Sequence, residues 1–487
     1  MERIRPEGTR FSDEYGRTRI FSGVNLVYKG CEPDSDGTVR YRFPAEESDL
    51  AALAARGVDL VRLGLTWAGV EPRPEIWNLP YLEGVRAAVR LCAKYGIRVL
   101  LDFHQDLYSA WCYCGDGAPE WACADPALGR KPKLIWAEGY FFNRSVQRSF
   151  DLFWNNAPVQ GKGLRDRYCD MLAHVAAFLA EEPNLMAVDV LNEPFPGSAG
   201  KRVGLRLLRD AASTLLFSKR VDRAAAVKAL AKGDIMGALA ILEDPCVITK
   251  IERRAARRVR DFDLKYYTPF FEAAAAAVHG VLPDVTVVSE NCYFSNMGIP
   301  CSLIPPPGVK GRFATAPHGY DLTVDTPLTN RADPARVDYI FAEHLRQQRR
   351  LGCPVIVGEW GGMVPGAESY PALEHLIETF DRNGWSQTYW HWFKGMEDSA
   401  IMDVLARPRP AAAAGTALRY GYDRRTKTFT LSYAGDPACR APTRVFLPEE
   451  PAAIDCPLPH RVVAEYGAMY LEIDPAPGAC RAEVRFR

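Results

Sequence analysis

Two apolar runs near the start of the chain, VDLVRLGL at 58–65 and RVLLDF at 98–103, decide the fold class. Both are apolar nearly throughout, which is typical of parallel strands covered on both faces. Between them lies the stretch 82–94, whose apolar spacing predicts an amphipathic helix. A strand, a helix and a second strand in this order predict a βαβ unit of an α/β protein.

The same alternation continues over the first four-fifths of the chain. We expect eight strands, at 20–27, 60–67, 98–104, 186–192, 286–290, 314–320, 354–359 and 387–392. Amphipathic stretches lie between them, and eight such units predict a closed (β/α)8 TIM barrel. An open, doubly wound sheet would show the same alternation. It would favour a glycine-rich turn after the first strand, and the sequence has none there.

Two segments depart from this alternation. Residues 201–260, between the fourth and fifth strands, are rich in Ala, Leu and Arg and predict a helical insertion. From residue 407 onward we expect short antiparallel strands instead, at 418–422, 428–433, 444–447, 462–465, 469–473 and 482–486. We therefore divide the chain into a barrel domain at 1–406, which carries the basic insertion 201–260, and a C-terminal β-sandwich at 407–487.

The overall charge and the start of the chain argue against some classes of protein. Sixty Lys and Arg residues balance sixty Asp and Glu residues in a chain of 487, so the formal net charge is zero. A nucleic-acid-binding domain normally carries a basic excess, so we expect no nucleic-acid partner. The sequence shows no bilayer-spanning apolar run and no signal-peptide pattern. The missing signal-peptide pattern and the odd number of cysteines, thirteen, together favour a cytoplasmic protein, or a secreted one if a leader has been trimmed. We expect a monomer.

Cys112, Cys114 and Cys123 form the only cluster of cysteines. The spacing Cys-x-Cys followed nine residues later by a single Cys lacks a fourth nearby ligand, which makes it a poor zinc signature. Buried free thiols and one disulfide that closes this loop are the alternatives. We expect no metal site.

Side chains able to carry chemistry gather at the carboxyl ends of the expected strands, where a barrel builds its active site. Strand by strand they are Arg62; His104, Gln105 and Asp106; Asn192 and Glu193; His318 and Tyr320; Glu359 and Trp360; and Trp390 and Trp392. Any one alone is weak evidence, because such residues often only end a strand. Their joint placement on one rim predicts a functional site.

Two carboxylates on opposite sides of a sugar are what glycoside hydrolysis requires. We expect Glu193 to be the general acid/base and Glu359 the nucleophile, with carboxyl groups roughly 5–5.5 Å apart for a retaining reaction. Arg62, His318 and Tyr320 are expected to surround Glu359 and keep it ionised. The pKa of Glu193 must instead be raised, so that it can donate a proton.

Other rim residues are candidates for sugar binding. Asn192 is placed to hydrogen-bond the sugar 2-hydroxyl, and Trp390 offers a flat apolar face to the ring. We interpret His104 as either a packed core histidine or part of a polar cleft, and Asp106 as either a sugar ligand or a loop cap. Asp102 is expected on the other side of the third strand, in a structural role. Five further tryptophans are expected to pack rather than to bind: Trp67, Trp111, Trp121, Trp136 and Trp154.

The motifs Asn192-Glu193-Pro194, His318-x-Tyr320 and Gly358-Glu359-Trp360 resemble those of the retaining glycoside hydrolases of family 5, within clan A. Longer stretches resemble the endoglycoceramidases of that family. They are DFHQDLYS at 102–109, GAPEWA at 117–122, FDLFWNN at 150–156, EPFPG at 193–197 and KTFTL at 427–431. The insertion 201–260 and the cysteines at 111–114 depart from the pattern of that group.

The resemblance implies hydrolysis of the β-glycosidic linkage between the glycan and the ceramide of glycosphingolipids, with retention and without a metal or organic cofactor. It implies the roles already given to Glu193 and Glu359. The sugar next to ceramide would be bound by Arg62, His104, Asn192, His318, Tyr320 and Trp390. The alternatives are a β-glucosidase acting on glucosylceramide or a steryl glucoside, a family 5 polysaccharide endoglycanase, and a non-catalytic glycolipid-binding module.

The insertion has a charge of its own. Residues 201–260 contain fifteen Lys and Arg and six Asp and Glu, an excess of nine positive charges that the rest of the chain balances. Apolar residues accompany these charges, as in Arg-rich helices that lie on anionic membranes. They are Leu205, Leu207, Leu208, Leu215, Leu216 and Phe217. A solvated helical hairpin packed on the barrel is the alternative to our hypothesis that this segment contacts lipid surfaces.

Overall fold

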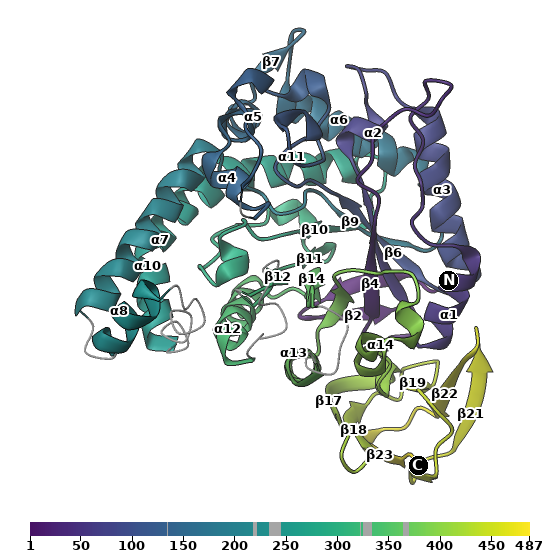
Figure 1. Ribbon diagram of the computed structural model, residues 1–487. Coiled ribbons are helices and arrows are strands. Elements are labelled where there is room, and N and C mark those ends of the chain that lie inside the picture. The colour runs from purple at the N-terminus through teal and green to yellow at the C-terminus, as the bar shows by residue number, and fades with distance from the viewer. Residues whose placement is uncertain (134, 218–221, 233–244, 322, 325–333, 364–369) are drawn as a thin grey trace.

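The computed structural model describes residues 1–133, 135–217, 222–232, 245–321, 323–324, 334–363 and 370–487. Its centre is an eight-stranded sheet whose neighbours are all parallel (Figure 1). In chain order the strands are β4 (Ser22–Val27), β5 (Leu60–Leu65), β6 (Arg98–Phe103), β9 (Leu185–Asp189), β10 (Thr286–Ser289), β11 (Phe313–Thr315), β13 (Ile356–Val357) and β15 (Ser386–Tyr389). In the sheet β11 and β13 are the two edge strands. A parallel bridge between Thr315 in β11 and Val355, just before β13, joins these edges and closes the sheet. The predicted closed barrel is therefore confirmed, and the open sheet is excluded.

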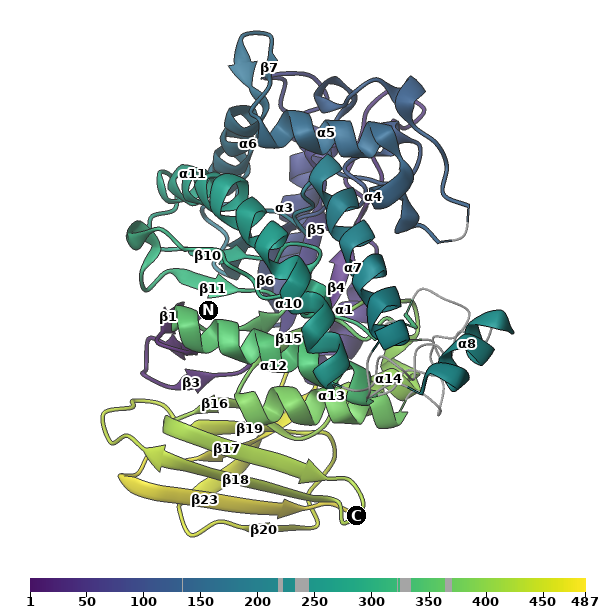
Figure 2. The same ribbon diagram turned by 90° about the vertical axis from the view of Figure 1, so that its left-hand side faces the viewer.

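Helices cover the outside of the barrel (Figures 1 and 2). They are α1 (Glu47–Ala55), α2 (Trp67–Val70), α3 (Leu79–Lys94), α4 (Glu138–Phe142), α5 (Arg144–Trp154), α6 (Leu164–Phe178), α11 (Thr268–His279), α12 (Pro334–Leu351), α13 (Tyr370–Asn383) and α14 (Ala400–Leu405). A short hairpin, β7 (Pro158–Val159) with β8 (Lys162–Gly163), precedes α6. The helices bury their apolar faces against the sheet, and Val85, Leu172 and Phe271 have no exposed surface. This packing leaves the rim of the barrel as the place where polar side chains meet.

Two of the predicted strands are each split in two. Residues 314–320 form β11 and the separate β12 (His318–Gly319), and residues 354–359 form β13 and β14 (Glu359–Trp360). The break in the first comes at Pro317, which has no N–H for the ladder; its carbonyl accepts the N–H of Gly358. Beyond the break β12 pairs with β14, so that His318 lies opposite Glu359. The split thus sets these two functional residues side by side.

The C-terminal residues form a β-sandwich, as predicted. One sheet has the order β17 (Gly415–Asp423), β18 (Thr428–Gly435), β23 (Gly478–Arg485) and β20 (Ala453–Asp455). The other contains β16 (Arg409–Ala413), β19 (Thr443–Leu447), β22 (Ala468–Ile473) and β21 (His460–Glu465). Alternate side chains from both sheets, such as Phe429, Val445 and Leu471, are buried between them. Strands β16 and β20 were not among the predicted ones.

The second sheet of the sandwich also contains the start of the chain. Strands β1 (Ile4–Glu7), β2 (Arg10–Asp13) and β3 (Thr18–Arg19) extend it, because β3 pairs with β16. Ile4 and Phe11 pack in one cluster with side chains from inside the barrel, such as Leu60 and Leu100. The N-terminal residues therefore join the sandwich to the barrel, and the domain boundary at 406/407 stays a prediction.

The insertion is helical in the residues described. It consists of α7 (Ser198–Phe217), α8 (Arg223–Ala231) and α10 (Pro245–Phe262), while 218–221 and 233–244 lie outside the described residues. α7 and α10 run side by side away from the barrel, and a π turn, Asp263–Tyr267, links α10 to α11 (Figures 1 and 2). None of the helices that the structure describes is both long and apolar enough to span a bilayer.

Candidate active site

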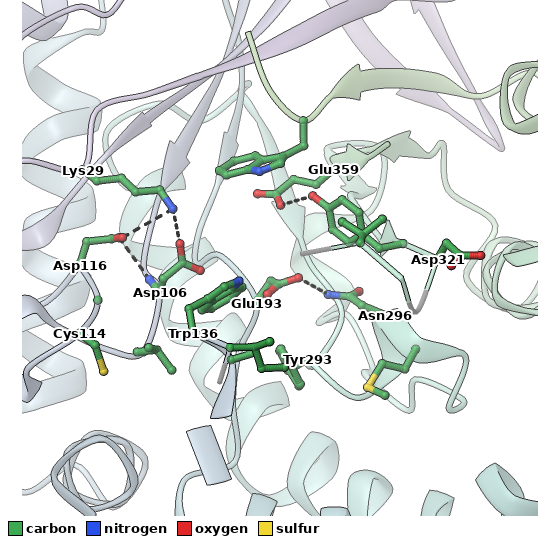
Figure 3. A pocket seen from close by; sticks show the side chains of 18 of the residues that line it. Lys29, Asp106, Cys114, Asp116, Trp136, Glu193, Tyr293, Asn296, Asp321 and Glu359 are labelled. Atoms are coloured by element: carbon green, nitrogen blue, oxygen red, sulfur yellow. Dashed lines mark hydrogen bonds and ion pairs between the residues drawn. The ribbon is translucent and has the colours of Figure 1, made fainter. Parts of the chain in front are cut away.

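The predicted rim residues do converge. Arg62 lies within β5, Glu193 follows β9, His318 and Glu359 lie in β12 and β14, and Trp390 follows β15. At this end of the barrel is an open cavity of about 830 Å³ (Figure 3). Residues that line it include Lys29, Asp106, Leu107, Asp116, Ile135, Trp136, Glu193, Tyr293, Asn296, Met297, Tyr320, Asp321, Val324, Glu359 and Trp390.

Glu193 and Glu359 face each other across this cavity. A carboxylate oxygen of each lies within 4.8 Å of the other. This agrees with the short separation predicted for a retaining enzyme, since an inverting pair needs roughly 6.5–9.5 Å to admit a water. The two carboxylates can therefore act on opposite sides of one glycosidic bond without a water between them.

Glu359 is held by the residues predicted to surround it. Arg62 Nη1 donates to its Oε1 at 2.7 Å, and the Tyr320 hydroxyl donates to its Oε2 at 2.7 Å. His318 Nδ1 lies 3.5 Å from Oε2. These contacts fix the position of the carboxylate. The predicted neighbours of Glu359 are therefore in place, and its role as nucleophile stays a prediction.

Glu193 lies in a different environment. Asn296 Nδ2 donates to its Oε1 at 3.0 Å, and His318 Nδ1 lies 3.0 Å from the same oxygen. Burial raises the pKa of Glu193, the hydrogen bond from His318 lowers it, and the negative charge of Glu359 adds to the rise. The net pKa of Glu193 is above its ordinary value, as a general acid requires. His318 thus contacts both carboxylates, and it lies closer to Glu193 than to the predicted partner Glu359.

The backbone of Glu193 is strained. Its φ is +40°, in the left-handed region that a residue with a Cβ seldom adopts. Glu290, which directly follows β10, holds this conformation by accepting the Glu193 N–H at 2.7 Å. Gln105 Nε2 donates to the carbonyls of Asn192 at 2.9 Å and of Glu193 at 3.3 Å. Glu290 was missed, although it is a carboxylate at the end of a predicted strand on the same rim.

Arg62 is fully buried below the cavity among four carboxylates. It lies 2.8 Å from Asp102, 2.6 Å from Glu290, 2.7 Å from Glu359 and 3.5 Å from Asp189. Burial lowers the pKa of Arg62, but these carboxylates outweigh it and raise the pKa well above its usual value. A permanently charged guanidinium therefore organises the floor of the site.

The expectation for Asp102 was wrong. Instead of pointing to the other side of its strand, Asp102 contacts Arg62 and lies 2.8 Å from His104 Nδ1. The reason is the period of two in a β-strand, which puts residues 102 and 104 on the same face. Both point into the barrel interior.

Asn192 lies beside Glu193, beneath the cavity surface. Its Oδ1 accepts from Arg62 at 2.9 Å, and its Nδ2 donates to the Gln105 carbonyl at 2.9 Å. An amide nitrogen carries a second N–H that could meet a ligand hydroxyl. Its predicted contact with a sugar stays a prediction.

One side of the cavity is strongly polar. Lys29 forms an ion pair with Asp106, lies 3.7 Å from Asp116, and stands 5.0 Å above the Trp390 ring (Figure 3). His104 stacks on the Trp390 ring with centroids 5.5 Å apart. Asp106 thus lies in the cleft and does not merely cap a loop.

The charges on this side are coupled. Burial lowers the pKa of Lys29, but the carboxylates of Asp106 and Asp116 outweigh it and raise the pKa. Burial also lowers the pKa of His104, yet Asp102 raises it to about 10. Burial together with the charge of Asp106 raises the pKa of Asp116 to about 6. Lys29 follows the predicted strand 20–27 by two residues, so its position on the rim could have been predicted from the sequence. Asp116 lies in a loop without a repeating apolar pattern, so the sequence does not place it at the cavity.

The rest of the cavity wall combines the polar side chains of Asn296, Tyr320 and Asp321 with apolar and aromatic ones. The apolar and aromatic ones include Ile135, Trp136, Tyr293, Met297 and Val324. Trp136 was expected only to pack, so its place on the cavity wall is a correction. Trp67 and Trp121 do pack as expected, edge to face with ring centroids 5.0 Å apart, and Trp154 is buried. Trp111 is exposed.

Some carboxylate and histidine side chains lie close enough together to be considered as metal ligands. Among the residues that the structure describes, three groups have ligand atoms within 4.8 Å of one another: Glu193, His318 and Glu359; His104, Asp106 and Asp116; and Asp102, Asp189 and Glu290. In the last two groups Lys29 and Arg62 already supply the positive charge that a metal would bring.

The twelve cysteines that the structure describes are free, which favours the free-thiol alternative over a disulfide in the 112–123 loop.

Comparison with known proteins places this geometry in a family. The sequence matches the cellulase model of glycosyl hydrolase family 5 over residues 28–232 and 259–395, more than half of the chain. The chain belongs to glycoside hydrolase family 5. Residues 407–457 match the C-terminal domain of the same family.

Among relatives of this family 5 chain, an endoglycoceramidase of Hydra vulgaris is 31% identical over 222 residues, 41% of this chain. That match also spans only 41% of the Hydra protein, less than half its length. Endoglycoceramidase I of Rhodococcus hoagii is 25% identical over 91% of this chain and 79% of its own. Endo-glycoceramidase II from Rhodococcus sp. has a similar fold, with a TM-score of 0.72 and 24% identity over 99% of this chain and all of its own. It has also been solved as a lactosyl-enzyme intermediate and as a ganglioside GM3 complex.

Proposed function

We propose that this family 5 enzyme hydrolyses the β-glycosidic linkage between the glycan and the ceramide of glycosphingolipids, releasing intact oligosaccharide and ceramide. The observation that carries the proposal is the mixed lining of the cavity. The charged side chains of Lys29, Asp106 and Asp116 suit sugar hydroxyls, and the apolar and aromatic ones, such as Trp136 and Met297, suit a lipid. The two carboxylates, Glu193 and Glu359, lie between Lys29 on one side and Asp321 on the other (Figure 3). The names of the relatives support the same substrate.

The geometry supports a double displacement. Glu359 attacks the anomeric carbon while Glu193 protonates the oxygen that leaves with ceramide, giving a covalent glycosyl-enzyme. Because the charge of Glu359 helps to raise the pKa of Glu193, forming the ester removes that contribution and the pKa of Glu193 falls. Glu193 can then take a proton from water as the water attacks the intermediate. The Tyr320 hydroxyl and Arg62 hold the leaving Glu359 carboxylate.

The test is the release of lactose and ceramide from lactosylceramide dispersed in detergent. We expect the wild-type protein to release both, with the β-anomer of the sugar formed first. Glu359→Ala should abolish release, and added azide should then give the α-linked glycosyl azide, because azide replaces the missing nucleophile. Glu83→Gln, at an exposed position on α3, is the matched control and should leave the rate unchanged. Release of ceramide by Glu359→Ala without azide would contradict the mechanism.

The same assay separates the alternatives. A β-glucosidase would release glucose from glucosylceramide or a steryl glucoside and would leave lactosylceramide intact. A polysaccharide endoglycanase would cleave a soluble β-glucan instead, and a non-catalytic binding module would release nothing from any of them. Release of intact lactose from lactosylceramide is the result that only the proposed function predicts.

A further inference from the structure

We propose that the side of the molecule around the cavity mouth docks on the surface of an anionic phospholipid bilayer. The docking face has two parts: a rim segment, residues 128–133 and 135–142, and the arm formed by α7 and α8. The benefit of docking rests on the proposed lipid substrate. The binding itself does not, and it can be measured on vesicles that contain no glycolipid.

The rim segment combines exposed apolar and cationic side chains. Ile135, Trp136 and Phe142 are exposed, with 52% of the surface of Phe142 open to solvent. Arg130 stands 5.3 Å over the Phe142 ring, and Lys131 is exposed beside it. Because Ile135 and Trp136 also line the cavity, this patch is continuous with the mouth of the active site. Aromatic side chains next to Lys and Arg are typical of the interfacial zone of membranes.

The arm continues this patch along α7. Leu205 and Leu208 are 56% and 68% exposed, and Lys201 lies on the same face of the helix at a spacing of four residues from Leu205. Gly204, four residues before Leu208 and on the same face of α7, packs on α4: a Cβ added there would lie 2.9 Å from the ring of Phe141. The exposed leucines therefore stand next to the rim segment, across the contact between α4 and α7.

Helix α8 follows α7 in the arm. Figure 2 shows α8 on the same side of the molecule as α4. On α8, Val227 is exposed together with Arg223 and Lys228. The described residues of this helix therefore repeat the combination of cationic and apolar side chains seen on the rim.

The positive charge of the insertion indicates that the bound surface is anionic. Residues 201–260 carry nine excess positive charges. Within this range, α10 has an exposed row of cationic side chains that includes Lys250, Arg253 and Arg257. Among the residues that the structure describes, Arg253 and Arg257 form no ion pair, so their charge is available to a partner. Lys and Arg near a membrane are attracted to its anionic lipids. The exposed leucines and aromatics favour a lipid surface over a nucleic acid, which would offer them no apolar phase.

Part of this charge lies outside the segments that match the family 5 model. The match to the family 5 model omits residues 233–258, which include the part of α10 that bears the cationic row. The remainder of the chain carries a negative excess of the same size, so a general electrostatic attraction of the whole protein to anionic lipid is not expected. Docking through the insertion places this positive charge against the membrane.

The test is flotation of the full-length protein with vesicles of phosphatidylcholine, with and without phosphatidylserine, at low and high salt. We expect the protein to float with phosphatidylserine vesicles at low salt and to be released at high salt, because screening weakens surface attraction. Leu205→Asp with Leu208→Asp, and separately Arg253→Glu with Arg257→Glu, should each weaken binding by about tenfold.

Val462→Asp, an exposed apolar residue on β21 in the sandwich, is the matched control and should bind as the wild type does. Hydrolysis of a soluble aryl lactoside should be unchanged in all these variants, which shows that they are folded. Equal binding of wild type and variants, or no binding to phosphatidylserine vesicles, would overturn the proposal. Vesicle binding without ceramide release would instead contradict only the proposed function.

Discussion

The proposed mechanism requires Glu193 to serve as an acid and then as a base, and its surroundings suit both roles. Burial and the charge of Glu359 raise its pKa, while His318 opposes them. Its backbone adopts φ of +40°, which costs of the order of 1–3 kcal/mol unless the surroundings hold it. Glu290 supplies this support by accepting the Glu193 N–H while also pairing with Arg62 and His318. The orientation of the catalytic acid therefore depends on a third carboxylate that does not line the cavity.

We predict that Glu290→Ala lowers kcat by about 10- to 100-fold and leaves KM nearly unchanged. The loss of hydrogen bonds to a charged group costs about 1.5–3 kcal/mol, and here it falls on the position of the acid rather than on substrate binding. Glu290→Gln keeps an acceptor for the Glu193 N–H and should recover part of the rate. Steady-state kinetics on an aryl lactoside test this. A large rise in KM with kcat intact would instead place Glu290 in substrate binding.

The raised pKa of Glu193 predicts a dependence on pH and on the leaving group. Glu193 must be protonated to act as an acid, so glycosylation should slow as the pH rises through its pKa, which lies above that of an ordinary Glu. Glu193→Ala should lose about 10²- to 10⁴-fold on a substrate with a poor leaving group. The first step with a dinitrophenyl lactoside, whose leaving group needs no proton, should change little. Pre-steady-state release of dinitrophenol measures that step, and an equal loss on both substrates would contradict the assignment.

At the scale of elements, the sequence predicted what regular periodicity controls. All eight barrel strands and the place of Glu193, His318 and Glu359 on one rim follow from alternation and strand ends. Periodicity does not predict that Pro317 would split one strand and set His318 opposite Glu359. Asp102 was placed on the wrong face, although the period of two already assigns it to the face of His104.

Residues on loops could be predicted less well. Asp116 reaches the cavity through the loop between Cys112 and Cys123, where neighbouring residues follow no repeating pattern. Lys29 becomes significant only because the fold sets it against Asp106 and Asp116. Trp136 was taken for a packing residue because a sequence does not reveal which side of a loop faces a cavity. Such contacts depend on the tertiary structure of the rim.

The π turn Asp263–Tyr267 between the insertion and the barrel gives a prediction about stability. Asp263 is fully buried, and burial raises its pKa to about 7, although the Ser302 N–H at 2.6 Å lowers it. In the unfolded chain its pKa is near 3.9. The folded state therefore holds the proton more tightly, and its stability falls as the pH rises from about 4 to about 7. Above that range the full cost of ionising a buried carboxylate remains.

We predict that Asp263→Asn stabilises the protein at pH 8 by up to about 4 kcal/mol and has little effect at pH 4, because an amide keeps the acceptor for Ser302 but cannot ionise. Urea unfolding at both pH values measures the difference. Asp261→Asn, at an exposed position in the same segment, is the control and should change stability by less than about 0.5 kcal/mol. An equal effect of Asp263→Asn at both pH values would exclude titration of this carboxyl as the cause.

At the scale of the whole molecule, the two domains share one structural unit. The N-terminal strands β1 to β3 add to a sheet of the sandwich, while Ile4 and Phe11 pack with the inside of the barrel. Arg409 on β16 reinforces the junction from the other direction. It donates to the carbonyls of Ile20 at 2.9 Å and Gly57 at 2.7 Å, and it pairs with Asp59 at 2.8 Å. The sandwich therefore braces the amino end of the barrel, opposite the catalytic rim.

We predict that Arg409→Met destabilises the barrel and not only the sandwich in which the residue lies. Arg409 is buried, and breaking a buried pair costs about 3–5 kcal/mol because the partner groups lose their donor. All ten tryptophans lie at or before residue 392, so tryptophan fluorescence during urea unfolding follows the barrel alone. Its midpoint should fall in Arg409→Met. Arg461→Met, on β21, removes an exposed ion pair with Glu472 on β22 and should shift the midpoint hardly at all. If Arg409→Met left the fluorescence transition in place while circular dichroism showed the sandwich unfolding earlier, the barrel would be stable without its brace.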